Sequence, residues 1–426
     1  MRIAIVGSGI AGNVAAYHLR RDHDITVFEA NDYIGGHTNT VDVEEDGRTL
    51  AIDTGFIVFN DHTYPSFISL LDELGQASKE TVMSFSVRSD DGRLEYNGSN
   101  LNGLFAQRRN LARPSFIRMV RDILRFNREA VLDIQDAANS GLTVGEYLAR
   151  EGYSRGFADD YLIPMTAAIW SAEPVQVEDM PLLFLVRFFK NHGLLQLKDR
   201  PVWHVIEGGS REYVRKLTAG HRDRIRLSTP IESVSRMGDH VQVKPVGGES
   251  EQFDHVFLAC HSGQALGMLA DPTEEERAVL GAIRYQSNEA VLHTDVSLLP
   301  KRRRAWAAWN YHIPTSPRDH VSVTYSMNML QRFDARREYC VTLNNTSAID
   351  PARIVYSTEY DHPIFDLGTI DAQARHREIC TGNRTSYCGA YWRNGFHEDG
   401  VHSALAALRY FEEDQQSAEL HIRRAS

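Results

Sequence analysis

The first 37 residues hold the pattern that most limits how this chain can fold. Arg2–Val6 is a short apolar run rich in β-branched residues, which suits a buried parallel strand. The motif Gly-Ser-Gly-Ile-Ala-Gly follows at residues 7–12, and residues 13 to about 21 are predicted to form a helix. A second strand, Asp24–Phe28, ends next to an acid, Glu29. This order of strand, glycine turn, helix, strand and acid is the βαβ unit that binds a dinucleotide.

Each part of this unit has a separate task. Gly7 permits a tight turn, Gly9 lets the backbone approach a pyrophosphate, and Gly12 lets the helix pack closely on the strand. The N-terminus of the helix offers free N–H groups and its positive dipole end to a phosphate. Glu29 lies 17 positions after Gly12, close to the spacing expected of the acid that binds a ribose. The residues predicted to bind the dinucleotide here are Gly7, Ser8, Gly9, Ile10, Ala11, Gly12, Glu29 and Ala30.

Charge and composition argue against several other classes of protein. The chain has 426 residues and a net charge of −11, which argues against general nucleic-acid binding. Its four cysteines show no CxxC spacing, so we expect neither a disulfide framework nor a metal site. The first strand starts at residue 2 and the chain has no run of about 18 apolar residues, so we expect neither a signal peptide nor a membrane span. These features predict a cytoplasmic protein.

The order of the predicted elements indicates an α/β fold with two interleaved domains. A Rossmann-like cofactor domain is expected at residues 1–75, 201–285 and 376–426. A substrate domain with a mixed sheet and a helical insert is expected at residues 76–200 and 286–375, and its predicted strands include residues 305–311 and 321–327. The insert is rich in large apolar side chains and should form a lid or tunnel over the cofactor. Core packing explains most of these side chains, and the alternative is a lining role for Trp170, Phe188 or His192.

Residues 107–128 form the most unusual stretch by composition, because they contain seven arginines. A helix that starts near Pro114 would place four arginines on one face: Arg118, Arg121, Arg125 and Arg128. It would place an apolar set on another face: Phe116, Ile117, Val120, Ile123 and Leu124. A basic amphipathic helix in an acidic protein is a candidate for peripheral contact with an anionic membrane, at its inner face. The alternative is a solvated helix whose arginines pair with nearby acids.

Four further motifs extend the pattern over nearly the whole chain. They are Gly-Gly-His-Thr at residues 35–38, Asp-Thr-Gly-Phe-Ile-Val-Phe-Asn at 53–60, Asn-His-Gly-Leu-Leu at 191–195 and Gly-Phe-His-Glu-Asp-Gly at 395–400. With these motifs the chain resembles the NAD/FAD-binding, amine oxidase-like branch of the flavin-containing amine oxidase superfamily. Its layout is similar to that of bacterial flavin-dependent polyunsaturated fatty acid isomerases. The resemblance implies a two-domain flavoprotein with non-covalent FAD, and the branch's association with fatty acid enzymes implies an acyl-chain substrate.

The resemblance also implies which residues contact the cofactor beyond the first unit. They are Gly35, Gly36, His37, Thr38, Thr54, Gly55, Phe56, Ile231, Ala259, Gly389, Phe396, His397, Glu398, Asp399 and Gly400. Ile231, in a strand predicted at residues 226–231, is expected to face the adenine, and a helix N-terminus at residues 395–400 is expected to face the flavin. The sequence departs from the family pattern at three positions. His37 replaces an arginine, Cys260 a threonine, and Ala390 an acid.

Three hypotheses for function follow. The first is an FAD-dependent oxidoreductase that desaturates, oxidises or isomerises a lipid acyl chain, by hydride transfer to the flavin N5. The second is an amine oxidase, which an acidic pocket floor and a placed lysine would favour. The third is a non-enzymatic flavin-binding regulator. By motif position, the candidate catalytic residues are Tyr391, Trp392 and His397, and no lysine falls in a matching motif.

Overall fold

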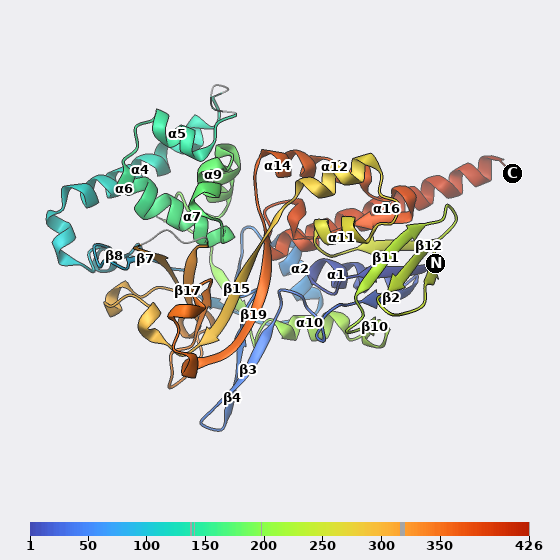
Figure 1. The fold of residues 1–426 in the computed structure, drawn as a ribbon, viewed down its shortest axis with the longest axis horizontal. Coiled ribbons are helices and arrows are strands. Elements are labelled where there is room, and N and C mark those ends of the chain that lie inside the picture. The colour runs from blue at the N-terminus through green and yellow to red at the C-terminus, as the bar shows by residue number, and fades with distance from the viewer. Residues whose placement is uncertain (137–138, 140, 197, 316–319, 426) are drawn as a thin grey trace.

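The protein is described by a computed structural model that covers residues 1–136, 139, 141–196, 198–315 and 320–425. Its elements separate into two halves that lie side by side in Figure 1, and both chain termini belong to the same half. Two long antiparallel strands, β15 (Tyr285–His293) and β19 (Ile354–Pro363), run along the boundary between the halves. The predicted two-domain α/β architecture is therefore confirmed, whereas the exact residue boundaries of the domains stay a prediction.

A five-stranded parallel sheet forms the core of the half that contains the termini. Its order is β10-β2-β1-β14-β20, and every neighbouring pair is parallel. The strands are β1 (Arg2–Val6), β2 (Asp24–Phe28), β10 (Ile225–Arg226), β14 (His255–Leu258) and β20 (Thr385–Tyr387). Parallel strands need crossover connections, so segments that are distant in sequence meet at the carboxyl edge of this sheet.

Successive side chains of β1 point to opposite faces of the sheet, which explains why this strand carries no polar residue after Arg2. Ile3 and Ile5 pack on one face of the sheet, against α1 (Ile10–Leu19) and α16 (His397–Ala425). Ala4 and Val6 pack on the other face, against α12 (Glu274–Ala282) and the small sheet β11-β12-β13. Because both faces are covered, a continuous apolar run is required.

The other half is built on a seven-stranded mixed sheet of order β19-β15-β18-β17-β16-β7-β8. Its remaining strands are β7 (Phe85–Ser89), β8 (Glu95–Asn97), β16 (Trp309–Ile313), β17 (Ser322–Ser326) and β18 (Cys340–Leu343). All pairs are antiparallel except β16 with β7. Strands β7 and β8 form an antiparallel hairpin.

The helical insert lies above one end of this sheet in Figure 1, where α4, α5, α6, α7 and α9 are labelled. Its elements are α3 (Leu101–Leu104), η1 (Arg108–Ala112), α4 (Pro114–Asp133), α5 (Val144–Arg150), α6 (Arg155–Phe157), η3 (Ala158–Leu162), α7 (Ile163–Trp170), α8 (Pro174–Asp179) and α9 (Leu182–Asn191). Buried aromatic side chains of α4, α5, α6 and α9 share one core with the mixed sheet. The insert is thus an integral part of the substrate half.

Three smaller groups of elements complete the fold. The hairpin β3 (Thr40–Glu45) and β4 (Arg48–Asp53) projects at the bottom of Figure 1, and β5 (Phe59–Asn60), β6 (Ser78–Thr81) and β9 (Trp203–Ile206) form a sheet. The small sheet contains β11 (Ile231–Arg236), β12 (Val241–Pro245) and β13 (Glu251–Phe253). The other helices are α2 (Pro65–Glu73), α10 (Arg211–Thr218), α11 (Ser262–Met268), α13 (Met327–Gln331), α14 (Leu367–Ala374) and α15 (His376–Ile379), with short 3-10 turns elsewhere. Within the described residues, no helix is both long and apolar enough to cross a membrane.

Several expected elements differ in the structure. The strand expected at 226–231 is two strands in different sheets, because Ser228 adopts a positive φ of 49° and turns the chain between β10 and β11. The strand expected at 305–311 starts only at Trp309, since residues 303–305 form a 3-10 turn. On α4, Leu124 is exposed instead of facing the core, and Arg125 turns inward to Glu129 and Glu151.

Candidate cofactor and substrate site

Two helix N-termini meet at the carboxyl edge of the parallel sheet. Gly400 in the first turn of α16 packs so closely on α1 that an added Cβ would lie 2.6 Å from the Ile10 side chain. Gly12 packs on the turn before α1, where an added Cβ would lie 2.0 Å from the Gly7 carbonyl oxygen. Next to Gly9, in contrast, an added Cβ would meet no heavy atom within 4 Å. The first N–H groups of both helices therefore border an open space, which is a favourable arrangement for an anion.

Glu29 ties the end of β2 to the glycine turn. Its Oε2 accepts hydrogen bonds from the backbone N of Ser8 (2.8 Å) and from Ser8 Oγ (2.6 Å), and its Oε1 accepts one from the N of Asn31 (2.8 Å). A carboxylate has about four acceptor positions, so Glu29 keeps capacity for a ribose hydroxyl. Its role as the ribose ligand stays a prediction, and the structure adds that it also positions Ser8.

The second glycine motif lies directly against the first. An added Cβ on Gly36 would lie 3.2 Å from the Gly9 Cα. The carbonyl oxygen of the next residue, His37, accepts a hydrogen bond from the backbone N of Phe56 (2.7 Å). Gly55 packs on the same carbonyl group, because a Cβ added to Gly55 would lie 2.2 Å from the His37 carbonyl oxygen. Residues 35–38 and 54–56, which were predicted separately as cofactor contacts, are therefore neighbours in space.

His397 lies in a closed hydrogen-bonded network beneath this region. Its Nε2 is 3.0 Å from Thr38 Oγ1 and 2.8 Å from the hydroxyl of Tyr213, and these two hydroxyls are 2.6 Å apart. The ring of Phe56 stacks on the imidazole with 3.6 Å between centroids. Burial lowers the pKa of His397 well below its usual value, so the ring is neutral. This arrangement suits a residue that positions the cofactor loop better than one that exchanges protons with substrate.

The adenine end of the predicted site is assembled by backbone contacts. The N of Thr229 donates to the carbonyl oxygen of Glu29 (2.8 Å), which brings Ile231 near the end of β2. On the other side, the N of Ala259 donates to Val6 (2.8 Å). Ala259 packs against Gly7 of the glycine turn, and the contacts of Ile231 and Ala259 with the cofactor stay a prediction.

Tyr391 and Trp392 do not lie with the other candidate catalytic residue. Both are buried in the core on the opposite face of the parallel sheet, and Trp392 stacks on His376 with 4.0 Å between ring centroids. Tyr391 lies edge-on to Tyr285 at 6.4 Å. Neither residue is among the described residues that line the two cavities of this region, so a direct catalytic role for them stays a prediction.

An aromatic cluster joins the helical insert to the start of α16. Its members are Trp170, Phe184, Phe188, His192, Phe365 and Phe396. Phe188 stacks on Phe396 at 5.4 Å and on His192 at 3.8 Å. The indole N–H of Trp170 donates to the carbonyl oxygen of Asn394 (3.0 Å), just before α16. The three residues considered for a lining role, Trp170, Phe188 and His192, are thus brought together.

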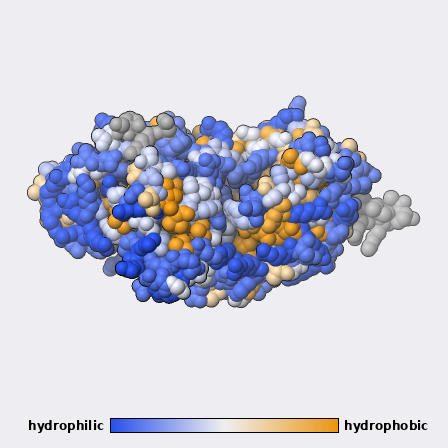
Figure 2. Space-filling view, turned by 60° about the horizontal axis from the view of Figure 1, so that its bottom comes forward, coloured by the Kyte–Doolittle hydropathy of each residue, from blue (hydrophilic) through white to orange (hydrophobic). Residues whose placement is uncertain are grey.

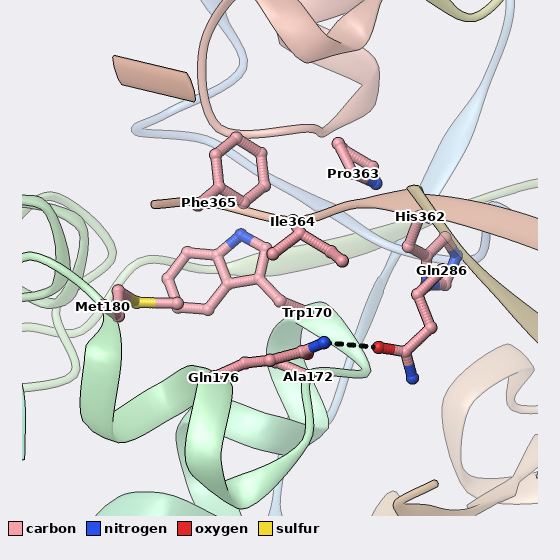
Figure 3. A pocket seen from close by; sticks show the side chains of 9 residues that line it. All are labelled: Trp170, Ala172, Gln176, Met180, Gln286, His362, Pro363, Ile364 and Phe365. Carbon is pink, nitrogen blue, oxygen red and sulfur yellow. Dashed lines mark hydrogen bonds between the residues drawn. The ribbon is translucent and has the colours of Figure 1, made fainter. Parts of the chain in front are cut away.

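Two hollows adjoin this cluster. Figure 3 shows a cavity of about 10 Å³, where Trp170 and Phe365 lie opposite His362, and Gln176 donates to Gln286 across one side at 3.0 Å. A larger cavity of about 310 Å³ opens between the insert and the cofactor half. Its described lining consists of His62, Thr63, Tyr64, Pro65, Asn191, His192, Arg393, Asn394, Phe396, Glu398 and Asp399. Figure 2 shows apolar residues gathered in two areas of one otherwise hydrophilic face of the molecule.

The two acids in this lining are held by backbone groups. Glu398 accepts hydrogen bonds from the N of Ser66 and of Phe67 at the start of α2 (3.1 and 2.8 Å). Asp399 accepts from the N of Asn394 and of Phe396 (3.2 and 2.9 Å), and burial raises its pKa to about 6. The lining described above contains no lysine.

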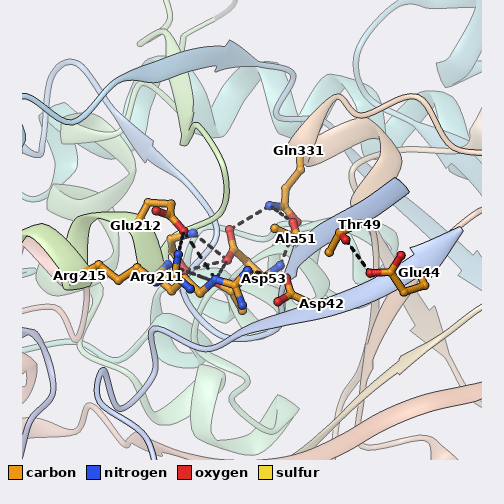
Figure 4. A network of polar contacts seen from close by, with 11 residues as sticks. Asp42, Glu44, Thr49, Ala51, Asp53, Arg211, Glu212, Arg215 and Gln331 are labelled. Atoms are coloured by element: carbon orange, nitrogen blue, oxygen red, sulfur yellow. Dashed lines mark hydrogen bonds and ion pairs between the residues drawn. The ribbon is translucent and has the colours of Figure 1, made fainter. Parts of the chain in front are cut away.

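Asp53, the first residue of the motif at 53–60, is hydrogen-bonded within the fold. Figure 4 shows it at the centre of a polar network that joins β4 to α10 and α13. Its Oδ1 accepts from Thr40 Oγ1, Ser210 N and Ser210 Oγ (2.6, 2.9 and 2.7 Å), and its Oδ2 from Gln331 Nε2 (3.0 Å). Ser210 and Gln331 come from different halves of the molecule, so Asp53 connects them. No local sequence pattern could identify Ser210 and Gln331 as partners, because they lie more than 150 positions away.

These observations fit FAD. The open space beside Gly9 and the two helix N-termini suit a pyrophosphate, and Glu29 suits a ribose. The Tyr391 hydroxyl is buried without a hydrogen-bond partner among the described residues, near the carboxyl edge of the sheet. The residues that would hold the group are those of the glycine turn, Glu29, residues 35–38 and 54–56, and the first turn of α16.

The sequence profile of the flavin-containing amine oxidoreductases matches residues 10–326, so the chain belongs to this family. The predictions of a flavin cofactor and of a flavin-dependent oxidoreductase are thereby confirmed. A protein from Mycobacterium tuberculosis assigned as a flavin-containing monoamine oxidase is 25% identical over 63% of this chain. The match spans 59% of that relative's length.

Solved structures share the fold over nearly the whole chain. Cyclohexylamine oxidase from Brevibacterium oxydans is 16% identical, with a TM-score of 0.66 over 97% of this chain and 99% of its own. A fatty acid isomerase from P. acnes is 17% identical, with a TM-score of 0.68 over 96% and 98% of the two chains. At these identities the likeness shows the fold alone, and it includes both an amine-directed and a lipid-directed enzyme.

Proposed function

We propose that this protein is an oxidoreductase with non-covalent FAD that desaturates, oxidises or isomerises a lipid acyl chain. The observation that carries the proposal is the aromatic cluster at the junction of insert and cofactor half. Its rings, joined through Phe188 and Phe396, offer a dry, apolar contact surface beside the predicted flavin-binding turn of α16. A saturated chain has no charge to recognise, so its binding depends on such a surface.

FAD, when bound, supplies an acceptor that can take up a hydride and can also return it. The chain's own residues position the substrate and exclude water. His192 contributes as a neutral ring, because burial lowers its pKa to about 4 and its Nδ1 lies 2.9 Å from the Phe188 carbonyl oxygen. Together with Phe188 it forms one wall between the 310 Å³ cavity and the aromatic cluster.

An amine oxidase is the second candidate, favoured by one observation. Glu398 and Asp399 give the 310 Å³ cavity an acidic floor, which suits a cationic amine. Two observations argue against an amine oxidase. Both carboxylates already accept two backbone N–H bonds each, and the described lining offers no lysine. A non-enzymatic flavin-binding regulator is the third candidate.

The first prediction tests cofactor and substrate together. Denaturation should release free FAD into solution, and mass spectrometry of the same extract should find an acyl chain. In anaerobic titrations, fatty acids should bleach the flavin absorbance or be recovered with a shifted double bond, whereas monoamines and polyamines should not react. Flavin that stays on the polypeptide would contradict non-covalent binding. Bleaching by amines alone would favour the amine oxidase. Neither bleaching nor a shifted double bond with any of these compounds would favour the regulator.

Membrane contact is a further part of the proposal, and helix α4 supports it. Its exposed stripe contains Arg118, Arg121, Leu124, Arg128 and Leu132. The preceding segment adds the exposed residues Leu101, Arg108, Arg109 and Leu111. Exposed leucines between arginines are typical of a surface that lies in a lipid headgroup layer. We propose that this surface, named the α4 stripe, binds anionic lipid and positions the acyl substrate.

The second prediction concerns the α4 stripe. Changing Arg118, Arg121 and Arg128 together to Gln should weaken binding to anionic vesicles about 100-fold, since each arginine contributes about 1 kcal/mol near such a surface. Co-sedimentation with anionic and neutral vesicles at two salt concentrations measures this effect. A matched control changes three exposed arginines of the other half: Arg215, Arg222 and Arg409. Equal, salt-independent recovery of all three proteins would remove the membrane proposal.

A further inference from the structure

We propose that three histidines, His37, His261 and His362, form a site for the FAD pyrophosphate that takes up a proton when the cofactor binds. The inference rests on FAD as the cofactor under the proposed function. It assigns the counter-charge for two phosphate groups to side chains that the sequence motifs do not connect. We call these three residues the histidine cluster.

The cluster is assembled from three separate elements. His37 follows Gly36, where an added Cβ would lie 3.2 Å from the Gly9 Cα, so the backbone of His37 adjoins the predicted phosphate site. His261 precedes α11, and its ring centroid is 6.1 Å from that of His37. His362 lies on β19, and its ring centroid is 5.7 Å from that of His37. All three side chains are half-buried, so they border solvent-accessible space instead of the closed core.

The surroundings of the cluster hold few charges. The carboxylate that faces the histidine cluster is that of Asp361 on β19, whose Oδ2 lies 3.6 Å from His261 Nδ1. The other titratable groups that face it are Tyr360 on β19, Tyr285 on β15 and His397 on α16. Ser171 Oγ lies 3.1 Å from His362 Nδ1. Among the described contacts of these three rings there is no arginine or lysine, although the related enzymes often place an arginine where this chain has His37.

Without an anion, positive charge is unfavourable on the rings of His37 and His362. Burial and the neighbouring imidazoles lower the pKa of His37 to about 3, and burial lowers that of His362 to about 4. At neutral pH both rings are therefore uncharged in the protein without cofactor. A pyrophosphate carries about two negative charges. When it binds, its negative charge attracts the protonated imidazole and raises the pKa of the ring.

This coupling has a defined sign. Because the histidine pKa is higher with FAD bound than without it, binding takes up a proton from solvent. The affinity for FAD therefore rises as the pH falls through the pKa of the bound state, by up to about tenfold per pH unit for one proton. A permanent guanidinium at residue 37 would give no such dependence.

The experiment is a titration of apoprotein with FAD between pH 5.5 and 8.5, followed by flavin fluorescence. Calorimetry in two buffers of different ionisation enthalpy counts the protons taken up. For the wild type we expect Kd to fall at least tenfold towards low pH, with about one proton bound per FAD. His37→Arg should bind FAD with a nearly flat pH profile. His37→Gln, and the double variant His261→Gln with His362→Gln, should bind weakly with a reduced slope.

The control is His240→Gln, which changes a half-buried ring paired with Asp239 outside the histidine cluster and should keep the wild-type profile. FAD binding without pH dependence or proton uptake in the wild type would overturn this inference and leave FAD as the cofactor. An undiminished slope in both glutamine variants would also overturn it. Absence of FAD binding at every pH would overturn the proposed cofactor as well, so the two failures are distinguishable.

Discussion

Replacement of Glu29 by alanine is expected to weaken FAD binding by at least about 100-fold. The carboxylate is predicted to accept charge-assisted hydrogen bonds from the adenosine ribose, each contributing about 1.5–3 kcal/mol. Two such bonds correspond to about 3 kcal/mol or more, which is a factor of 100 or more in Kd. The loss is larger if Ser8 moves, because Glu29 also holds the N and Oγ of Ser8 at 2.8 and 2.6 Å.

The measurement is flavin occupancy after purification and FAD affinity of the apoprotein, together with turnover per bound flavin. Turnover per bound flavin should change little, since Glu29 lies at the adenosine end of the cofactor and not at the reacting ring. The matched control is Asp32→Ala, which removes an exposed acid three positions away. Unchanged occupancy in Glu29→Ala would show that Glu29 is not the ribose ligand.

Replacement of Asp53 by alanine is expected to lower the free energy of unfolding by about 3 kcal/mol or more. The side chain is fully buried and accepts four hydrogen bonds, from Thr40, Ser210 and Gln331. Its loss leaves buried donors without partners and separates β4 from α10 and α13. Chemical denaturation of the apoprotein measures the change. Asp42→Ala, in the same hairpin but with a largely exposed side chain paired to Arg211, should cost less than about 1 kcal/mol.

Asp53 also gives stability a pH dependence of known sign. Burial raises its pKa from 3.8 to about 6, so the folded state holds a proton that the unfolded state has released. The contribution of Asp53 to the free energy of unfolding is largest below about pH 4. It decreases as the pH rises from about 4 to about 6 and does not change further at higher pH. Asp53→Asn does not ionise, so the stability difference between wild type and this variant should shrink over the same window. A difference that is constant from pH 4 to 7 would contradict the raised pKa.

The cofactor half could be predicted because its information is local in the sequence. Strand, glycine turn, helix and acid follow one another within about 30 residues, and each glycine is required by a contact with its immediate neighbours. The structure confirms the elements and adds the crossing contact between Gly400 and Ile10. Residues 35–38 and 54–56 were likewise predicted as cofactor contacts from their motifs. The structure places residues 35–38 against the glycine turn and residues 54–56 against residues 35–38.

The direction of a side chain could not be predicted where distant elements determine it. Tyr391 and Trp392 follow a cofactor motif, and the structure places them in the core on the other face of the sheet, so their catalytic role stays a prediction. Leu124 was placed with the apolar face of α4, but the insert covers too narrow a stripe of that helix to bury it. In both cases the packing of distant elements determined the outcome.

The sequence by itself determined the class of cofactor, the two-domain α/β fold and the family, because these depend on short-range order and on spacing along the chain. Only the tertiary structure decided which residues share the space around that cofactor. His37, His261 and His362 come from three elements separated by up to 325 positions, and Asp53 joins partners from two halves. Such contacts arise when crossover connections bring strand ends to one edge of a sheet, and no local pattern encodes them.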